Sequence, residues 1–304
     1  MALALPKRTV PEPAEELCVN GATLRFYLGD CLSVLPGLPR ASASVAVTSP
    51  PYNLGIRYRS YADDLPRGQY LAWTEAWMRS LKRVLAPEAS FFLNVGSKPT
   101  DPWIAMDVAL VGRKQFALQN TLHWVKSIAI DAEAAGRSAG LDKTLAVGHY
   151  KPINSERFVN DCHEYVFHFS PDGRTPLDRR ALGVPYQDAS NIGRWQGAGG
   201  GTRCRGNAWF IPYDTIQKRD RDRPHPATFP AKLPEFCLRL HGLDRVTQVI
   251  DPFNGLGTTA LACAQLGIDY VGIELDETYL AGTIERIRQL RKLEVKTRNS
   301  KLNT

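Results

Sequence analysis

The sequence lacks the patterns that mark membrane proteins, disulfide scaffolds and zinc proteins. No apolar run approaches the roughly 18 residues that a membrane-spanning helix needs. None of the six cysteines lies in a Cys-x-x-Cys pair, so neither a disulfide framework nor a zinc site is indicated. We therefore expect a protein with no membrane contact and no metal, and a reducing cytoplasm suits its cysteines best.

Size and charge set only broad limits on what the chain is. Its 304 residues, 43% of them hydrophobic, suffice for one large α/β domain or two modest ones. The net charge of +7 permits a polyanionic partner, but an ordinary basic protein would carry the same charge. The opening MALALPKRTVPEPAEE has too short an apolar stretch for a secretion signal, and we expect residues 1–15 to form a flexible tail.

Apolar runs of strand length alternate with helical patterns along the chain. Seven strands are predicted, at residues 23–28, 44–47, 90–95, 121–125, 164–169, 246–250 and 270–273. Helices are predicted at residues 69–85, which Pro87 would end, and at 235–242, 260–266 and 276–293. This alternation predicts an α/β fold with a parallel sheet covered by helices on both faces.

The periodic pattern fades between residues 171 and 223, where Gly, Pro and Arg become frequent. From Arg174 to Arg223 there are ten Lys or Arg against five Asp, so this segment carries +5 of the net charge of +7. Long irregular inserts of this kind are usually functional or disordered. The positive charge of the chain is therefore concentrated in this insert.

A glycine-rich stretch, DPFNGLGTT at residues 251–259, follows a predicted strand and opens a helix. Such a unit can bind a nucleotide, because a helix N-terminus has unpaired N–H groups and glycines permit close approach. Glu274, at the end of the next strand, can accept hydrogen bonds from both hydroxyls of a ribose. Gly255-x-Gly257-x-x-Ala260 also satisfies the dinucleotide fingerprint, so an NAD-dependent oxidoreductase and a ligand-free turn stay open. The loop follows most of the predicted strands, which indicates a circularly permuted order and argues against a nicotinamide enzyme.

A second motif, TSPPYN at residues 48–53, ends the predicted strand 44–47. Two consecutive prolines cannot continue a strand, because neither has a backbone N–H and both fix φ. The result is a stiff polar turn with an aromatic tip. Alone, it is compatible with a plain strand-ending turn or with an active site.

Together, TSPPYN and DPFNGLGTT resemble the motifs of the amino-methylating DNA methyltransferases of the permuted β group. Three further elements match in order: Gly29-Asp30, His163-Glu164 with the strand that follows, and the His-Pro segment at residues 225–230. The resemblance covers nearly the whole chain. It implies a Rossmann-like S-adenosylmethionine-dependent methyltransferase fold, with a mostly parallel seven-stranded sheet and helices on both faces.

The resemblance also implies a cofactor, S-adenosyl-L-methionine, and residues that contact it. Glu274 would hold the ribose, Asp30 would lie near the adenine, and residues 225–229 would flank the methionine moiety. Asp251 would lie near the amino-acid end of the cofactor. The full cofactor set is Asp30, His225, Pro226, Thr228, Phe229, Asp251, Phe253, Gly255, Gly257, Thr258, Thr259 and Glu274.

Ser49, Pro50, Pro51 and Tyr52 are the predicted catalytic residues. An exocyclic amine of a base is a poor nucleophile because its lone pair is delocalised into the ring. Ser49 Oγ and the Pro50 carbonyl, held rigidly by the two prolines, would accept both N–H bonds and free that lone pair. Tyr52 would stack on a flipped-out base.

Two observations bear on the base that is methylated. A cytosine-C5 methyltransferase needs a nucleophilic cysteine, typically after a proline, and no cysteine of this chain follows one. In the β group, serine at the first motif position goes mostly with cytosine N4 and aspartate with adenine N6. Ser49 therefore favours cytosine, with adenine N6 as the alternative.

The resemblance divides the chain into a catalytic half at residues 16–170, a target-recognition insert at 171–223, a cofactor-binding half at 224–293 and a basic tail at 294–304. We expect the insert to contact double-stranded DNA, and its arginines favour a G·C-containing target. A cognate restriction endonuclease and a homodimer are further expectations, and an inactive DNA-binding module is the remaining alternative. The DNA-contact candidates are Arg174, Arg179, Arg180, Arg194, Trp195, Arg203 and Arg205.

Overall fold

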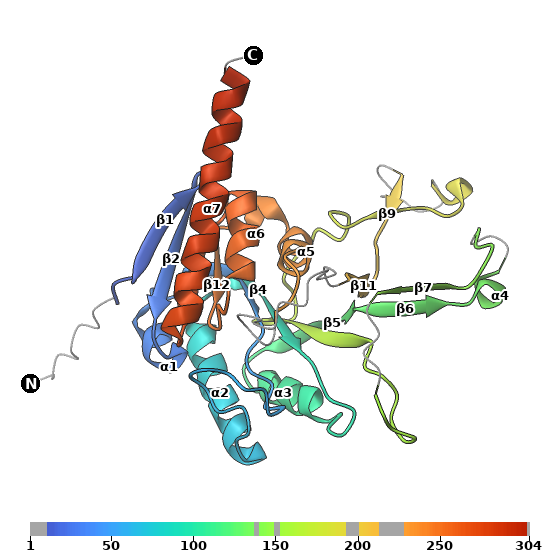
Figure 1. The fold of residues 1–304 in the computed structure, drawn as a ribbon, viewed down its shortest axis with the longest axis horizontal. Helices are drawn as coiled ribbons and strands as arrows, with labels where there is room; N and C mark the ends of the chain where they lie inside the picture. The colour runs from blue at the N-terminus through green and yellow to red at the C-terminus, as the bar shows by residue number, and fades with distance from the viewer. Residues whose placement is uncertain (1–10, 137–139, 149–152, 193–200, 213–227, 303–304) are drawn as a thin grey trace, which may run out of the picture.

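The computed structural model describes residues 11–136, 140–148, 153–192, 201–212 and 228–302, and a large mixed sheet runs through this part of the chain (Figure 1). The order of its nine strands is β1-β2-β13-β12-β3-β4-β8-β5-β11. Their bounds are β1 Glu15–Val19, β2 Ala22–Leu28, β3 Ala43–Thr48, β4 Leu85–Val95, β5 Ala117–Val125, β8 His163–Ser170, β11 Ala208–Phe210, β12 Gln248–Asp251 and β13 Asp269–Glu274.

All seven predicted strands form, and they lie next to one another as the centre of this sheet. Strands β2, β13, β12, β3 and β4 are parallel neighbours, whereas β8 runs antiparallel to both β4 and β5. The predicted count of seven was too low for the whole sheet, since β1 and β11 extend its two edges. A three-residue strand such as β11 has too few residues to show a periodicity.

Helices cover both faces of the sheet, as the burial of β3 requires, because all six of its residues are buried. The face that buries Trp77 and Phe91 is covered by α1, α2 and α3, and the face that buries Phe236 and Cys263 by α5, α6 and α7. Their bounds are α1 Cys31–Val34, α2 Arg67–Val84, α3 Ile104–Arg113, α5 Lys232–His241, α6 Thr258–Leu266 and α7 Glu277–Leu302.

Besides the short helices at residues 31–34 and 132–135, which were not predicted, the structure departs from the sequence predictions at three longer helices. Pro87 does not end α2: the helix stops at Val84, and Pro87 lies near the start of β4, before the regular pairing with β3 resumes at Ser90. Helix α3 was not predicted. Helix α7 continues to Leu302, past its predicted end at residue 293, and extends beyond the body of the domain (Figure 1).

Two small sheets lie outside the main one. Strands β6 (Ser127–Ile130) and β7 (Leu145–Gly148), with α4 (Ala132–Ala135) between them, form an arm that projects from the body (Figure 1). Strands β9 (Val184–Pro185) and β10 (Thr202–Arg203) pair inside the predicted insert. Within the described residues, no helix is long and apolar enough to cross a membrane.

The predicted insert is tied into the domain at several points. Thr175 Oγ1 donates to the carbonyl of Ala89 at 3.1 Å, and Trp209 and Ile211 are buried in the main core. Trp124 Nε1 donates to the carbonyl of Ile211 at 2.7 Å. These segments of the insert are therefore joined to the sheet, through β11 beside β5 and through Thr175 at β4.

Candidate active site

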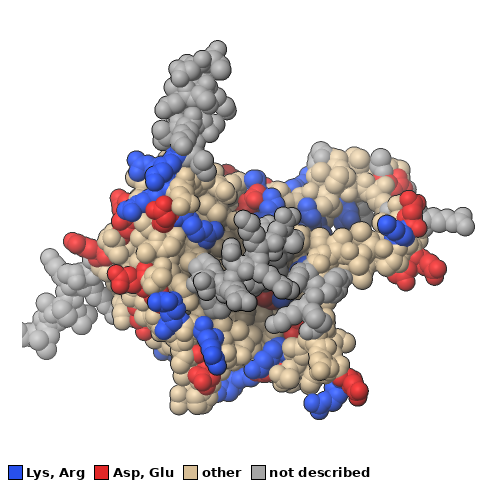
Figure 2. Space-filling view, viewed as in Figure 1, with Lys and Arg blue, Asp and Glu red and all other residues tan. Residues whose placement is uncertain are grey.

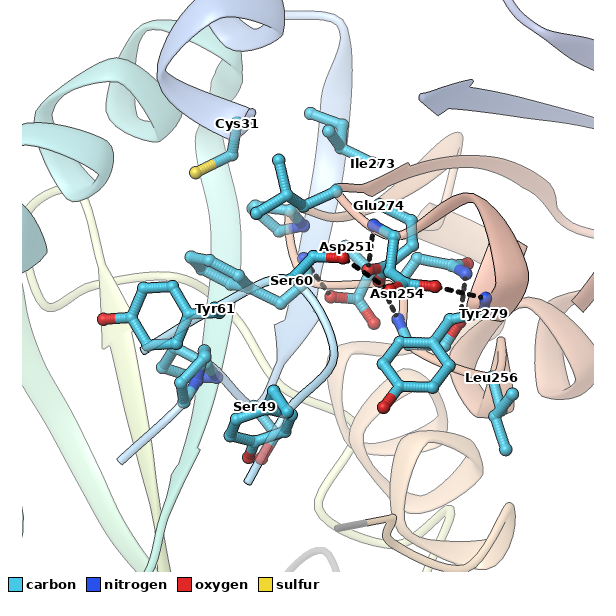
Figure 3. A pocket seen from close by; sticks show the side chains of 18 of the residues that line it. Cys31, Ser49, Ser60, Tyr61, Asp251, Asn254, Leu256, Ile273, Glu274 and Tyr279 are labelled. Atoms are coloured by element: carbon cyan, nitrogen blue, oxygen red, sulfur yellow. Dashed lines mark hydrogen bonds between the residues drawn. The ribbon is translucent and has the colours of Figure 1, made fainter. Parts of the chain in front are cut away.

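A cavity opens at the carboxyl edge of the parallel strands, where ligands bind in open α/β sheets. The empty space within it, with its open mouth included, is about 1090 Å³. Figure 3 shows side chains from the N-terminal and C-terminal parts of the chain meeting around it. Of the sequence-predicted residues, those that line it are Asp30, Ser49, Pro50, Pro51, Tyr52, Thr228, Phe229, Asp251, Phe253, Gly255, Thr258 and Glu274.

The glycine loop is held by a network behind the cavity. Gly257 has φ 69°, and a Cβ at this position would lie 2.3 Å from Thr283 Cγ2. Asn254 donates to Thr283 Oγ1 and accepts from Tyr270 Oη, both at 2.9 Å. Gly257 and the fully buried Thr259 do not line the cavity, so their place is in the support of the loop.

Glu274 ends β13 beside this loop and is 9% exposed. Its carboxylate accepts from the backbone N–H groups of Gly255, at 2.6 Å, and Asp276, at 2.9 Å. Burial raises the pKa of Glu274 to about 7, although these two hydrogen bonds oppose the shift. The carboxylate is thus fixed in direction and close to its titration point at neutral pH.

Asp251 ends the neighbouring strand β12 and is 1% exposed. Its Oδ1 accepts from Thr48 Oγ1 at 2.5 Å and from the N–H of Phe253 at 3.0 Å. Burial raises the pKa of Asp251 to about 6. Because Thr48 is the last residue of β3, this bond joins the glycine loop to the strand that precedes the Ser-Pro-Pro-Tyr turn.

The Gly29-Asp30 step lies against the same pair of strands. The N–H of Gly29 donates to the carbonyl of Glu274 at 2.8 Å, and Asp30 caps α1 by accepting from the N–H of Leu32 at 2.8 Å. Cys31 follows in the cavity wall, where burial raises the pKa of its thiol and keeps it neutral.

The Ser-Pro-Pro-Tyr turn carries two hydroxyls that face one another. Ser49 Oγ and Tyr52 Oη lie 2.5 Å apart, and the Pro51 carbonyl accepts from Tyr70 Oη at 2.8 Å. Tyr70 is a fully buried residue of α2, so it holds the turn to the body of the domain. The turn is therefore stiff both in its own dihedral angles and in its attachment.

Three polar residues behind the turn had no predicted role: Asn94 on β4, Lys126 after β5 and Glu164 on β8. Asn94 Nδ2 donates to Tyr52 Oη at 3.0 Å and to Glu164 Oε2 at 2.6 Å, while Lys126 Nζ lies 3.1 Å from Glu164 Oε1. Glu164 belongs to the His163-Glu164 element that matches the methyltransferase family, but no role was predicted for it. A polar residue near the end of an apolar strand was the available signal for Asn94.

The loop that follows the turn, residues 53–66, was also not predicted as part of the site. Asp63 accepts from the N–H groups of Asn53 at 2.7 Å, Leu54 at 3.1 Å and Ile56 at 3.0 Å, which closes the loop on itself. Ser60 Oγ then donates to Asp276 Oδ2, beside Glu274, at 2.5 Å. Tyr58 and Tyr61 of this loop line the cavity, and Figure 3 shows Tyr61 and Ser60 at its wall.

The predicted DNA contacts lie in different settings. Arg174, Arg179, Arg180 and Arg203 are exposed, whereas Arg205 is half-buried, donates to the carbonyl of Leu182 at 3.1 Å and lies over the ring of Phe236. Figure 2 shows Lys and Arg interspersed with Asp and Glu over the described residues of the face in view. Arg194, Trp195, His225 and Pro226 lie outside the described residues. In the part of the chain that is described, no group of three or more His, Cys, Asp or Glu could hold a metal ion.

Comparisons with known proteins agree with this architecture. The family model for DNA methylases matches residues 43–285. The type II methyltransferase M.XycI of Xanthomonas campestris pv. cyanopsidis is 29% identical over 91% of this chain and 90% of its own length. M.ScaI of Streptomyces caespitosus, also a type II methyltransferase, is 28% identical over 86% of this chain and 80% of its own length.

Solved structures of low sequence identity share the fold. The cytosine-N4-specific PvuII DNA methyltransferase superposes with a TM-score of 0.59 at 20% identity, covering 92% of this chain and 94% of its own. TTHA0409 of Thermus thermophilus, in its complex with S-adenosyl-L-methionine, superposes with a TM-score of 0.56 at 22% identity, covering 88% and 94%. With a family match that spans most of its length, this chain belongs to the DNA methylases.

Proposed function

We propose that the protein transfers a methyl group from S-adenosyl-L-methionine to the exocyclic N4 of a cytosine at a specific site in double-stranded DNA. One observation carries the proposal: the Ser49 hydroxyl and the Glu274 carboxylate line the same cavity, from the ends of β3 and β13. The Ser49 hydroxyl can accept a hydrogen bond from a target amine, and the Glu274 carboxylate can accept hydrogen bonds from a ribose. Membership of the DNA methylase family removes the nicotinamide-dependent oxidoreductase.

The chemistry of the cavity fits this cofactor. A nucleoside needs a diol acceptor and a flat apolar wall, and Glu274 and Phe253 provide them. A sulfonium and an ammonium group are favoured beside carboxylates, and Asp251 and Asp276 are both in the wall. S-adenosyl-L-methionine supplies an electrophilic methyl group when it is bound.

The residues of the turn would activate the amine. Ser49 Oγ and the Pro50 carbonyl accept its two N–H bonds, which draws the nitrogen towards tetrahedral geometry and frees its lone pair. Rigid placement of these acceptors lowers the barrier without cost at the moment of reaction. The target base must leave the helix to reach them, and Tyr52 would offer it a stacking face.

Ser49 is what favours cytosine N4 over adenine N6, by the habit of serine at this motif position. The test is transfer of labelled methyl groups to unmethylated DNA, followed by digestion to nucleosides and mass spectrometry. We expect N4-methylcytosine with the wild type. Ser49→Ala should abolish turnover and leave DNA binding largely intact, whereas unchanged methylation by this variant would refute the assignment.

The remaining parts of the proposal concern DNA and partners. Exposed arginines of the insert, such as Arg174 and Arg203, would contact phosphates or guanine edges of a G·C-containing site. The type II relatives support a role in restriction and modification, for which we propose a cognate endonuclease that acts on the same site. A homodimer is compatible with this role.

A further inference from the structure

A continuous line of hydrogen bonds leads from the cavity into the protein through the Ser-Pro-Pro-Tyr turn. Ser49 Oγ lies 2.5 Å from Tyr52 Oη, and Tyr52 Oη donates to Glu164 Oε2 at 3.2 Å. Lys126 Nζ lies 3.1 Å from the other oxygen of Glu164. Ser49 lines the cavity, whereas the side chain of Glu164 is only 14% exposed.

The donors of this line have one consistent arrangement. Asn94 Nδ2 donates to both Tyr52 Oη and Glu164 Oε2, so the tyrosine proton can point at the carboxylate and the serine proton at the tyrosine. The whole line then runs in one direction, from Ser49 to Tyr52 to Glu164.

Both N–H bonds of the Asn94 side chain are used in this arrangement, whereas its carbonyl oxygen Oδ1 is left without a hydrogen bond among the described residues. The residue is 2% exposed, so this oxygen is buried. An unsatisfied buried oxygen costs stability. We infer that Asn94 is oriented by its bonds to Tyr52 and Glu164, and that this orientation serves the function of the site.

Gly96 lies beside the hydrogen bond between Tyr52 and Glu164, where a larger residue would crowd both side chains. A Cβ at this position would lie 3.1 Å from Tyr52 Cε2 and 3.2 Å from Glu164 Cδ, closer than ordinary contacts. The tyrosine ring and the carboxylate thus approach one another across a residue that has no side chain.

Methyl transfer to an amine creates the need for such a line. As the N–C bond forms and the bond between methyl and sulfur breaks, the nitrogen becomes cationic and must release one N–H proton. We propose that Glu164 is the end of a relay for this proton: the amine proton passes to Ser49 Oγ, the Ser49 proton to Tyr52 Oη, and the Tyr52 proton to Glu164 Oε2. The carboxylic acid so formed returns its proton to solvent before the next turnover.

This inference deepens the proposed function and rests on it. Tyr52 has two tasks in this account, since its ring faces the base and its hydroxyl carries the proton. Glu164 is not among the residues that line the cavity, so it is a positioning and relay residue that acts through Tyr52 and Ser49. Asn94 orients the relay, and Lys126 places a positive charge beside its terminal carboxylate.

The test compares Glu164→Gln with a matched control, Glu75→Gln. Glu75 lies on α2 outside the cavity and pairs with Lys114 Nζ at 2.7 Å, so the control also replaces a lysine-paired carboxylate with an amide. General-base contributions are typically 10²–10⁴-fold. We expect Glu164→Gln to lower kcat by roughly 100-fold with KM for cofactor and DNA changed less than about threefold, and Glu75→Gln to keep both.

The pH profile of kcat separates a proton acceptor from a merely structural residue. Asp161, His163, Tyr58 and Lys126 also face Glu164, and the neutral amide of Glu164→Gln leaves all four in place. If Glu164 accepts the proton, the pH dependence of kcat in Glu164→Gln should differ in shape from that of the wild type. Glu75→Gln should keep the wild-type shape.

Tyr52→Phe supplies a second variant, because it interrupts the relay and keeps the ring. The double variant Tyr52→Phe with Glu164→Gln should be no slower than the slower single variant, since both changes break one path. Near wild-type kcat in Glu164→Gln would overturn the relay, and so would a slow variant that keeps the pH dependence of the wild type. If the wild-type protein methylates no DNA base, the proposed function itself is wrong. A failure of the relay alone would instead leave the wild type active and only the results for the variants changed.

Discussion

Glu274→Gln is the substitution that probes the cofactor site most sharply. Each oxygen of the Glu274 carboxylate accepts one backbone hydrogen bond, from the N–H of Gly255 or of Asp276, so the orientation of the carboxylate is fixed. Hydrogen bonds to charged groups contribute about 1.5–3 kcal/mol each. Loss of the charge towards a ribose diol should therefore weaken cofactor binding by about 2–3 kcal/mol, which is roughly 30- to 150-fold.

The raised pKa of Glu274 adds a second, independent signature. Burial places this pKa at about 7 in the free protein, and ribose donors would favour the ionised form, so binding should release a proton. Affinity should then rise with pH: at pH 6 about one tenth of the sites are ionised, and the dissociation constant should be roughly tenfold larger than at pH 8. Asp251, with a pKa of about 6, adds to the slope only at the acid end.

Calorimetric titration with S-adenosyl-L-methionine between pH 6 and 8 measures both quantities. The wild type should show the tenfold change, and Glu274→Gln should show weaker binding that is nearly independent of pH above 6.5. A wild-type affinity that does not change with pH over this range, or a variant that keeps the pH dependence, would refute the role of Glu274 in cofactor binding.

Three further predictions follow from other parts of the structure. Gly257→Ala should lower the free energy of unfolding by at least about 2 kcal/mol, because φ is 69° and Thr283 occupies the Cβ position. The control Gly21→Ala, at φ 82° with nothing within 4 Å of the added Cβ, should lower it by only about 1 kcal/mol. Equal losses of the two variants in urea titrations would contradict this. Ser60→Ala removes the bond from Ser60 to Asp276 that holds the loop 53–66 over the cavity, so the cofactor should dissociate about fivefold faster in stopped flow; an unchanged rate would exclude that role for the bond. His168 and His241 both contact Ser90 Oγ, and burial lowers their pKa values to about 3 and about 4, so each destabilises the folded state as pH falls below 6.5. His168→Asn should therefore gain about 1 kcal/mol on the wild type between pH 6.5 and 5.5, and a pH-independent difference would argue against a neutral buried histidine.

The sequence was sufficient to predict the elements whose pattern is local. Apolar runs found the seven central strands, and the two stiff or glycine-rich motifs were expected at strand ends, where the structure has them. The prolines of TSPPYN and the glycines of DPFNGLGTT are legible because their backbone restrictions act within a few residues.

The missing parts depend on contacts between distant segments. Asn94 and Glu164 are 70 residues apart and meet only because β4 and β8 are antiparallel neighbours. Asp63 looks like any loop aspartate until the loop closes around it. Gly257 was predicted as a cofactor residue from its motif, but its neighbour Thr283 of α7, which lies where a Cβ at Gly257 would be, is one that no local pattern indicates.

The most direct test of the central claim is to express the protein in a host without DNA methylation and to sequence the genomic DNA by a method that separates N4-methylcytosine from N6-methyladenine. We expect N4-methylcytosine at one recurrent sequence that contains G·C pairs, and its complete loss with Ser49→Ala. Methyl groups on adenine N6, or DNA without any new modification, would contradict it.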